Sequence, residues 1–367
     1  MTAFVPGLAL AHSCYLELVA PLVDVPHTAC LIGEGSEVLG YDDPRSTDHE
    51  WGPRLQLFVA TEDVASVSAR IDNDLGAEHR GYPTRWFSLS TQRIDHHIEV
   101  GTLSGWLHQR MPELLIEPSW TRDHPPTDDG RALDNAGWLA TPQQHLLQLT
   151  SGNVFRDDLG TLTRLRAELG WYPTDVWRWL IATQWQRIGI TEPFLGRTMD
   201  AGDQRGARLI VSRLCRLIME MAFLQERRYR PYDKWFGRAF TELEADKTLG
   251  PLIDDALAAP PLPSATSALS RALLSLADRH NQLAISEAVK PKIDDFQVMI
   301  NDAVRPFPVL NTSELINATL QAISDRQLRD LPRIGSIDQL TEADDTMINF
   351  SHGPRAMAEL YRAMSPA

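Results

Sequence analysis

Residues 31–51 constrain the fold of this chain more than any other segment. They read LIGEGSEVLGYDDPRSTDHEW, and eleven residues separate Ser36 from Asp48. The run before Gly33 is short and apolar, which is typical of a buried strand, and Gly33 and Gly35 then predict a sharp turn that leads into a helix. Backbone amides at such a turn can hold phosphate groups, so we expect Gly35 and Ser36 to contact a nucleotide.

Two acids follow this turn. The segment EWGPRLQLFV from residue 50 predicts a strand, on which Asp48 and Glu50 would project from the same face. Two carboxylates about 5 to 6 Å apart repel each other by roughly 3 kcal/mol at an effective dielectric near 20, so a cation is expected between them. Paired oxygen ligands suit Mg²⁺, which takes its other ligands from water and phosphates. The alternative is a solvated strand end that carries two acids.

A third acid comes from the segment RIDHHIEVGTL at residues 93–103. Ile94, Ile98 and Val100 share one face of the predicted strand, while Asp95 and Glu99 share the other. We expect Glu99 to complete a two-metal site, either as a ligand or as the base that deprotonates an attacking hydroxyl group. Otherwise Glu99 is an ordinary surface acid.

These motifs resemble the nucleotidyltransferase superfamily that includes the kanamycin nucleotidyltransferases and DNA polymerase beta. The chain is most similar to a bacterial family known as domain of unknown function 4037. That resemblance covers most of residues 5–240, and it rests on the 31–51 segment together with FRDDLG, WYPTDVWRWLIATQWQRIG, FLGRTMDAGDQRGARL and RRYRPYDKWF.

The resemblance implies an α/β (α+β) nucleotidyltransferase domain with a mixed sheet, followed by an all-α helical bundle. It implies that Gly35 and Ser36 contact the triphosphate and that Asp48 and Glu50 bind the metal. Glu99 is implied as the third acid. Two further residues just before the acid pair, where related enzymes have basic or hydroxyl side chains, are expected to face the phosphates: Arg45 and Ser46.

The helical part also supplies candidates for nucleotide binding. On the predicted helix at about residues 204–229, four arginines form one stripe: Arg205, Arg208, Arg213 and Arg216. Guanidinium groups recognise phosphate bidentately, so Arg213 is a candidate for nucleotide binding. The alternative is that the stripe only pairs with Asp200, Asp203 and Glu220. Tyr232 and Lys234 are weaker candidates, with Lys234 placed to neutralise the leaving pyrophosphate.

Breaks rich in proline and acids divide the sequence. They predict a catalytic domain at 1–116, a linker at 117–134, a helical domain at 135–257 and a C-terminal helical extension at 268–367. The tryptophans of residues 171–185 follow helical spacing, which indicates a packed core rather than a surface for stacking a base. We expect His280 to be a structural residue.

Composition indicates a cytoplasmic protein. The three cysteines are in no metal or redox spacing, the first twenty residues predict an amphipathic helix rather than a signal peptide, and no apolar run is long enough for a membrane helix. The net charge of −14 opposes binding to long nucleic acid and favours a small, cationic acceptor.

The sequence therefore predicts an enzyme that transfers a nucleoside monophosphate from an NTP to a hydroxyl group of a small molecule. Two alternatives remain open. One is a nucleotide-binding protein without catalytic activity, with a regulatory role, and the other is a nucleotidyltransferase of a toxin–antitoxin type that modifies a protein. The residues do not identify the acceptor, the base of the NTP or the oligomeric state.

Overall fold

The computed structural model of the chain describes residues 4–89, 91–111, 132–258, 262–298, 303–349 and 352–365. The chain folds into two compact units. Unit 1 comprises Met1–Gly137 and Gln144–Gly170, and unit 2 comprises Trp138–Gln143 and Trp171–Ala367.

Unit 1 contains a five-stranded mixed sheet with the strand order β5-β6-β2-β1-β7. Its strands are β1 (Thr28–Leu31), β2 (Arg54–Phe58), β5 (Arg85–Ser88), β6 (Arg93–Gly101) and β7 (Asn153–Asp157). β2 and β6 are parallel, and the other neighbouring pairs are antiparallel. A separate small ladder joins β3 (Glu78–His79) to β4 (Tyr82–Pro83). The predicted mixed sheet is confirmed.

Helices α1 (Gly7–Cys14) and α2 (Val64–Asp74) take part in the apolar core on one face of this sheet. There Leu55, Leu57 and Ile98 of the sheet pack in one cluster with Val67 and Ile71 of α2. Because successive strand residues point to opposite faces, the residues between these apolar positions lie on the other face. The polar side chains of β2 and β6 are therefore gathered on one side of the sheet. Unit 1 also contains α3 (Leu103–Arg110), α6 (Thr161–Glu168) and all but the first residue of α5 (Gln143–Thr150). The boundary between the units at Gly137 falls within α4 (Asn135–Ala140).

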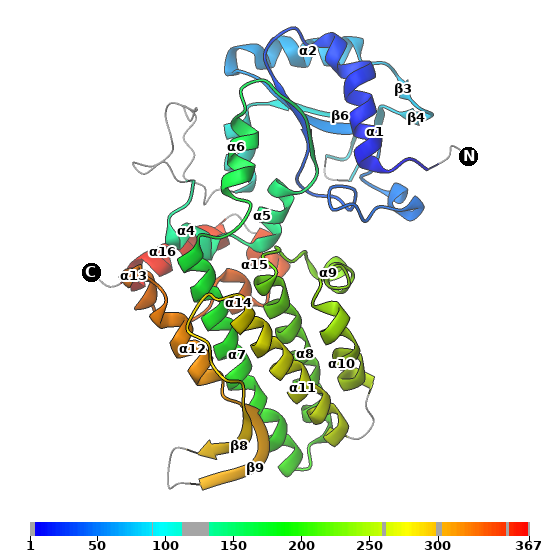
Figure 1. Cartoon of the computed structure of the whole chain (residues 1–367). Coiled ribbons are helices and arrows are strands. Elements are labelled where there is room, and N and C mark those ends of the chain that lie inside the picture. Colours follow the sequence, from blue (N-terminus) through cyan, green and yellow to red (C-terminus); the bar gives the residue numbers. More distant parts are fainter. Residues whose placement is uncertain are drawn as a thin grey trace. The chain divides into compact units, whose positions relative to one another are not determined.

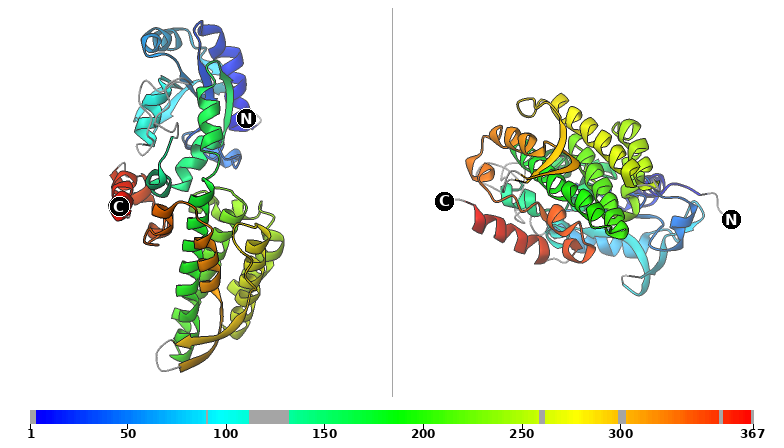
Figure 2. Two further views of the ribbon diagram at one scale, coloured as in Figure 1. Left: turned by 60° about the vertical axis from the view of Figure 1, so that its left-hand side comes forward. Right: turned by 90° about the horizontal axis from the view of Figure 1, so that it is seen from below.

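Unit 2 is mainly helical. Its long helices α7 (Thr174–Asp200) and α8 (Gln204–Gln225) are joined by a tight turn and lie side by side, with α11 (Leu262–Gln282) against α8 and α12 (Thr312–Gln321) against α7 (Figures 1 and 2). The shorter helices are α9 (Asp233–Phe240), α10 (Asp246–Ala258), α13 (Arg326–Arg329), α14 (Ile337–Thr341), α15 (Asp345–Asn349) and α16 (His352–Met364). A hairpin of β8 (Ile293–Val298) and β9 (Ala303–Leu310) interrupts the helices.

Aromatic side chains at helical spacing form the core of unit 2, as predicted. Trp177, Trp179 and Trp185 of α7 are at most 1% exposed. His280 is also buried and accepts a hydrogen bond from Trp185 Nε1 at 3.2 Å, which confirms its structural role. Burial of His280 lowers its pKa to about 4, so it is neutral near pH 7.

The domain limits differ from those expected. Residues 144–170, which we placed in the helical domain, include β7, and β7 pairs with β1 at the edge of the sheet of unit 1. The expected break at residues 258–268 overlaps the start of α11, and the expected helical extension contains the β8–β9 hairpin. Most of the expected linker lies outside the described residues, which resume at residue 132.

The remaining expectations concern the N-terminus and the cysteines. Residues 7–14 form helix α1, and Cys14, Cys30 and Cys215 are free and buried. Among the described residues, no helix has both the length and the apolar character that crossing a bilayer requires.

Candidate functional site

The turn after β1 is built on two glycines in conformations that other residues rarely adopt. Gly33 has φ +90° and Gly35 has φ +125°. A Cβ atom on Gly35 would lie 2.6 Å from a carboxylate oxygen of Glu37 and would also overlap the guanidinium group of Arg54. The predicted turn is confirmed, but hydrogen-bonded turns follow it rather than a helix: Tyr41 N donates to Ser36 O at 2.8 Å and Gly40 N donates to Glu37 O at 3.1 Å.

A buried ion pair stabilises this turn. Glu37 is 3% exposed, and its Oε1 accepts from Arg54 Nε at 2.7 Å and lies 2.5 Å from Arg54 Nη2. The same Nη2 donates to the backbone carbonyl of Glu34, while the Glu34 side chain is exposed. Arg54 therefore joins the first residue of β2 to the backbone of the glycine turn. Neither Glu37 nor Arg54 was predicted from the sequence.

Three of the predicted phosphate-facing residues lie close together beside this turn. Ser36 Oγ donates to Ser46 Oγ at 3.3 Å. Ser46 belongs to a capping box at the start of the 3₁₀ helix Pro44–Asp48, in which Asp43 Oδ1 accepts from the backbone amides of Arg45 at 2.8 Å and Ser46 at 3.2 Å. The structure thus brings Ser36, Arg45 and Ser46 to one loop cluster next to Gly35.

The predicted strand for the acid pair is wrong. Asp48 ends the 3₁₀ helix, Glu50 has φ +48°, and β2 begins only at Arg54. Pro53 explains why β2 begins only after it, because proline has no amide hydrogen to donate to a sheet. The two carboxylates therefore do not share the face of a strand.

The two acids of the pair have separate partners. The Asp48 side chain is 70% exposed and lies 2.5 Å from His49 Nδ1. Glu50 accepts hydrogen bonds from Ser88 Oγ at 3.1 Å and from Leu89 N at 2.5 Å, next to the end of β5. The two carboxylates therefore share no hydrogen-bond partner among these contacts.

Glu99 lies on β6, as predicted, in register with Gln56 of the parallel strand β2. Its Oε2 accepts from Trp106 Nε1 at 3.2 Å, and its Oε1 lies 3.2 Å from Arg110 Nη2. The Arg110 guanidinium group also lies over the Trp106 ring, 4.6 Å from its centre. Gln56 Oε1 accepts from Ile32 N at 3.0 Å, so this polar face of the sheet reaches the residue just before the glycine turn.

His97 lies two residues before Glu99 on the same face of β6. Its ring stacks on Trp86 with ring centres 3.6 Å apart and planes inclined by 11°. Burial lowers the pKa of His97, and the nearby carboxylate of Glu50 acts in the opposite direction. His97 thus places a mostly neutral imidazole near Glu50. The alternation of residues along β6 puts His97 on the same face as Glu99, so its position could have been predicted from the sequence.

A metal site with three acids is not assembled in this arrangement. Within the described residues, no group of three or more histidine, cysteine, aspartate or glutamate side chains is arranged to hold a metal ion. The oxygen donors of Asp48, Glu50 and Glu99 suit Mg²⁺ chemically, but their present directions do not bring them to one point. The metal assignment of these residues stays a prediction.

The remaining candidates belong to unit 2. Arg213 Nη2 lies 3.0 Å from Glu342 Oε1, and Glu342 has φ +56° directly after α14. Tyr232 is the residue before α9, and Lys234 is the second residue of α9, with its Nζ 4.9 Å from the centre of the Trp235 ring. Lys234 therefore lies at the start of a helix.

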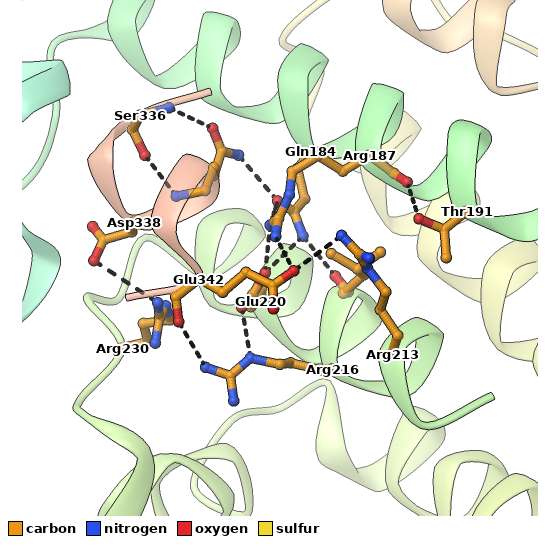
Figure 3. A network of polar contacts seen from close by, with 12 residues as sticks. Gln184, Arg187, Thr191, Arg213, Arg216, Glu220, Arg230, Ser336, Asp338 and Glu342 are labelled. Atoms are coloured by element: carbon orange, nitrogen blue, oxygen red, sulfur yellow. Dashed lines mark hydrogen bonds and ion pairs between the residues drawn. The ribbon is translucent and has the colours of Figure 1, made fainter. Parts of the chain in front are cut away.

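Arg213 lies at the edge of a network of charged side chains that has Glu220 near its centre (Figure 3). Glu220 is 5% exposed and accepts from Arg187 Nη1 at 2.8 Å and from Arg216 Nε at 3.2 Å. Burial acts to raise the pKa of Glu220, but Arg230, Arg187 and Arg216 together hold it below its ordinary value. The expected pairing of the arginine stripe with Glu220 is confirmed for Arg216.

Acids from the C-terminal part of the chain complete this network. Arg230 Nη2 lies 3.8 Å from Asp338 Oδ1, and both side chains are at most 4% exposed. Glu342 also lies 3.8 Å from Arg187 Nη2, through its Oε1. Sequence spacing could not have found these pairs, because more than one hundred residues separate their members.

One family resembles part of this chain. The family described as "Domain of unknown function (DUF4037)" matches residues 138–236, which include Arg187, Arg213, Glu220 and Arg230 of the network. No curated protein and no solved structure matches the chain. The match supports the resemblance to this family over the helical segment and does not extend to residues 31–51.

Proposed function

We propose that the protein is a Mg²⁺-dependent nucleotidyltransferase that transfers a nucleoside monophosphate from an NTP to a hydroxyl group of a small molecule and releases pyrophosphate. The observation that carries this proposal is the turn at residues 33–36. It follows a strand of a mixed sheet and contains two glycines with positive φ. Arg54 stabilises it through the backbone carbonyl of Glu34 and the carboxylate of Glu37. Such a turn presents backbone amides that can bind a triphosphate.

Each residue of the loop cluster has a role in this proposal. Amides near Gly35 and the hydroxyl groups of Ser36 and Ser46 would bind the β- and γ-phosphates, and Arg45, which is exposed in the same cluster, would neutralise their charge. Preorganised donors of this kind lower a barrier to phosphoryl transfer without covalent chemistry by the protein.

Asp48 and Glu50 would hold Mg²⁺, which would supply positive charge at the reacting phosphate. Asp48 is 70% exposed, so its carboxylate can turn away from His49 at low cost. Glu50 has to leave Ser88 and Leu89, which is a larger change because it gives up two hydrogen bonds. Nucleotide binding is therefore proposed to reorient both acids.

Glu99 would act on the acceptor. In the transfer, the acceptor hydroxyl oxygen bonds to the α-phosphorus, the bond to the bridging oxygen breaks, and pyrophosphate leaves with the electron pair. The hydroxyl proton passes to Glu99, whose side chain is 41% exposed. The net charge of −14 supports a cationic acceptor rather than a polyanion.

One observation favours a second candidate function. The separate partners of Asp48 and Glu50 would suit a protein that binds a nucleotide on its glycine turn and has no catalytic activity. Such a protein would bind NTP with similar affinity with and without Mg²⁺ and would release no pyrophosphate.

Calorimetric titration with each of the four NTPs, with and without Mg²⁺, distinguishes the two functions. For the enzyme we expect Mg²⁺-dependent binding that is lost in Asp48→Asn. Asp74→Asn is a matched control, because Asp74 is an exposed acid of unit 1 at the end of α2. Binding that is equal in Asp48→Asn and in the wild type would contradict the metal assignment, and no binding of any NTP would contradict both functions.

A further inference from the structure

Unit 2 contains a cavity of about 510 Å³ that the proposed nucleotide chemistry does not use. It lies among α7, α8, α11 and β9, and its apolar lining includes Leu195, Met199, Leu214, Leu269 and Phe307. Ligand sites typically measure roughly 300–1,000 Å³ and are mostly apolar with a few polar groups. The size and the lining of this cavity therefore match those of a site for a small organic molecule.

One wall of the cavity is formed by close packing between β9 and α7. A Cβ atom on Gly196 would overlap the ring of Phe307, so this glycine lets the ring lie directly on the helix. Phe307 also stacks on Phe296 with ring centres 5.6 Å apart, and Pro306 and Pro308 flank it. Proline restricts the backbone on both sides of the ring, so the wall is preorganised.

A single buried acid faces this apolar space. Glu192 is 6% exposed and lines the cavity, and its Oε2 accepts from Leu310 N at 3.0 Å. Its second oxygen, Oε1, has no hydrogen-bond partner within the described residues. The described lining contains no lysine, arginine or histidine, and its other acid is the exposed Asp200.

The charges of the cavity lining indicate which kind of ligand it can bind. A buried carboxylate without a cation is costly, so burial raises the pKa of Glu192 to about 8, and a cation at hydrogen-bond distance stabilises the ionised form of the side chain. The protein supplies no such cation among the described lining residues, whereas Asp200 and the overall charge of −14 attract one from solution. An ammonium group on an apolar body fits both the acid and the surrounding side chains.

We propose that this cavity binds a small apolar molecule that carries one amine, with the ammonium group on Oε1 of Glu192 and the apolar body against Leu195, Leu214 and Phe307. Hydrogen bonding at Oε1 gives the orientation, and burial of the apolar body gives most of the affinity. Binding at this site needs neither the glycine turn nor Mg²⁺, so it stands apart from the nucleotidyltransferase proposal.

The test uses two fluorescent probes that differ in one group. Dansylcadaverine has an aromatic body and a chain that ends in a primary amine, and its analogue ends in a hydroxyl group instead. With the full-length protein at pH 9, where the carboxyl group of Glu192 is mostly ionised because its pKa is about 8, we expect the amine probe to bind with a blue-shifted emission and about tenfold more tightly than the hydroxyl probe. Equal affinity of the two probes, or no blue shift with either, would overturn the proposal.

Three variants locate the site. In Glu192→Gln, which keeps an oxygen for Leu310 N, we expect the amine probe to bind no more tightly than the hydroxyl probe. Ser270→Phe fills the cavity from α11 and should remove binding of both probes. Glu359→Gln changes an exposed acid of α16 and should leave both affinities unchanged. A preference for the amine that persists in Glu192→Gln, or binding that persists in Ser270→Phe, would place the probe elsewhere and refute the site.

Discussion

The strongest prediction concerns the pH dependence of stability at Glu192. Burial raises the pKa of Glu192 from 4.5 to about 8, and the hydrogen bond from Leu310 N offsets only part of this effect. Between these two values the folded protein holds a proton that the unfolded chain releases. The free energy of unfolding therefore falls as the pH rises through this window.

The magnitude follows from the width of the window. Inside the window each pH unit lowers the free energy of unfolding by about 1.4 kcal/mol, so the wild type loses about 3 kcal/mol between pH 4.5 and pH 7 and about 4 kcal/mol by pH 8. Glu192→Gln keeps an acceptor for Leu310 N and does not titrate. The variant should therefore match the wild type near pH 4.5 and exceed its stability by about 3 kcal/mol at pH 7.

Urea unfolding at pH 4.5, 7 and 8.5 tests this prediction, with tryptophan fluorescence as the signal because Trp177, Trp179 and Trp185 are buried in the same helix as Glu192. Comparing two variants at each pH cancels the contributions of all other titrating groups. Glu359→Gln should show no difference from the wild type that depends on pH. A stability difference between Glu192→Gln and the wild type that is constant from pH 4.5 to 8.5 would refute the reasoning.

Three further predictions concern unit 1. Asp48→Asn should reduce pyrophosphate release in a coupled assay by on the order of 100-fold or more while leaving the melting temperature unchanged, and full activity would contradict the metal role. Arg54→Met leaves Glu37 buried without its cation and should cost about 3 to 5 kcal/mol in urea unfolding. Adding Glu37→Gln should recover part of that loss, and a strictly additive double variant would show that the two side chains do not interact. Gly152→Ala should destabilise the protein by more than about 1 kcal/mol, because φ is +67° and the added Cβ would overlap the carbonyl oxygen of Leu31; a melting temperature equal to that of the wild type would contradict this.

The sequence predicted those helices and strands that depend on the order of residues within one short segment. The apolar run before Gly33 became β1, and the helical spacing of Trp177 and Trp185 became α7. The glycine turn was also predictable, because glycine adopts positive φ without the steric penalty that other residues incur, as Gly33 and Gly35 do here.

Features that depend on distant partners were not predictable. The side chain of Glu37 is buried only because Arg54 meets it across the turn, and β7 is a strand only because β1 pairs with it. β9 contains Pro306 and Pro308, which argue against a strand in sequence, yet it pairs with β8 at the edge of a two-stranded ladder where missing amides are tolerated. The direction of Glu50 depends on Ser88 and Leu89, which lie on another strand and the turn after it.

The charge network of unit 2 has a practical consequence for protein fragments. The family match ends at residue 236, whereas Asp338 and Glu342 lie about one hundred residues further along the chain. A fragment cut at the limits of the match would contain Arg213 and Arg230 but would lack the acids that face them. The matched segment is therefore shorter than unit 2, and we expect a truncated protein to aggregate or unfold where the whole chain does not.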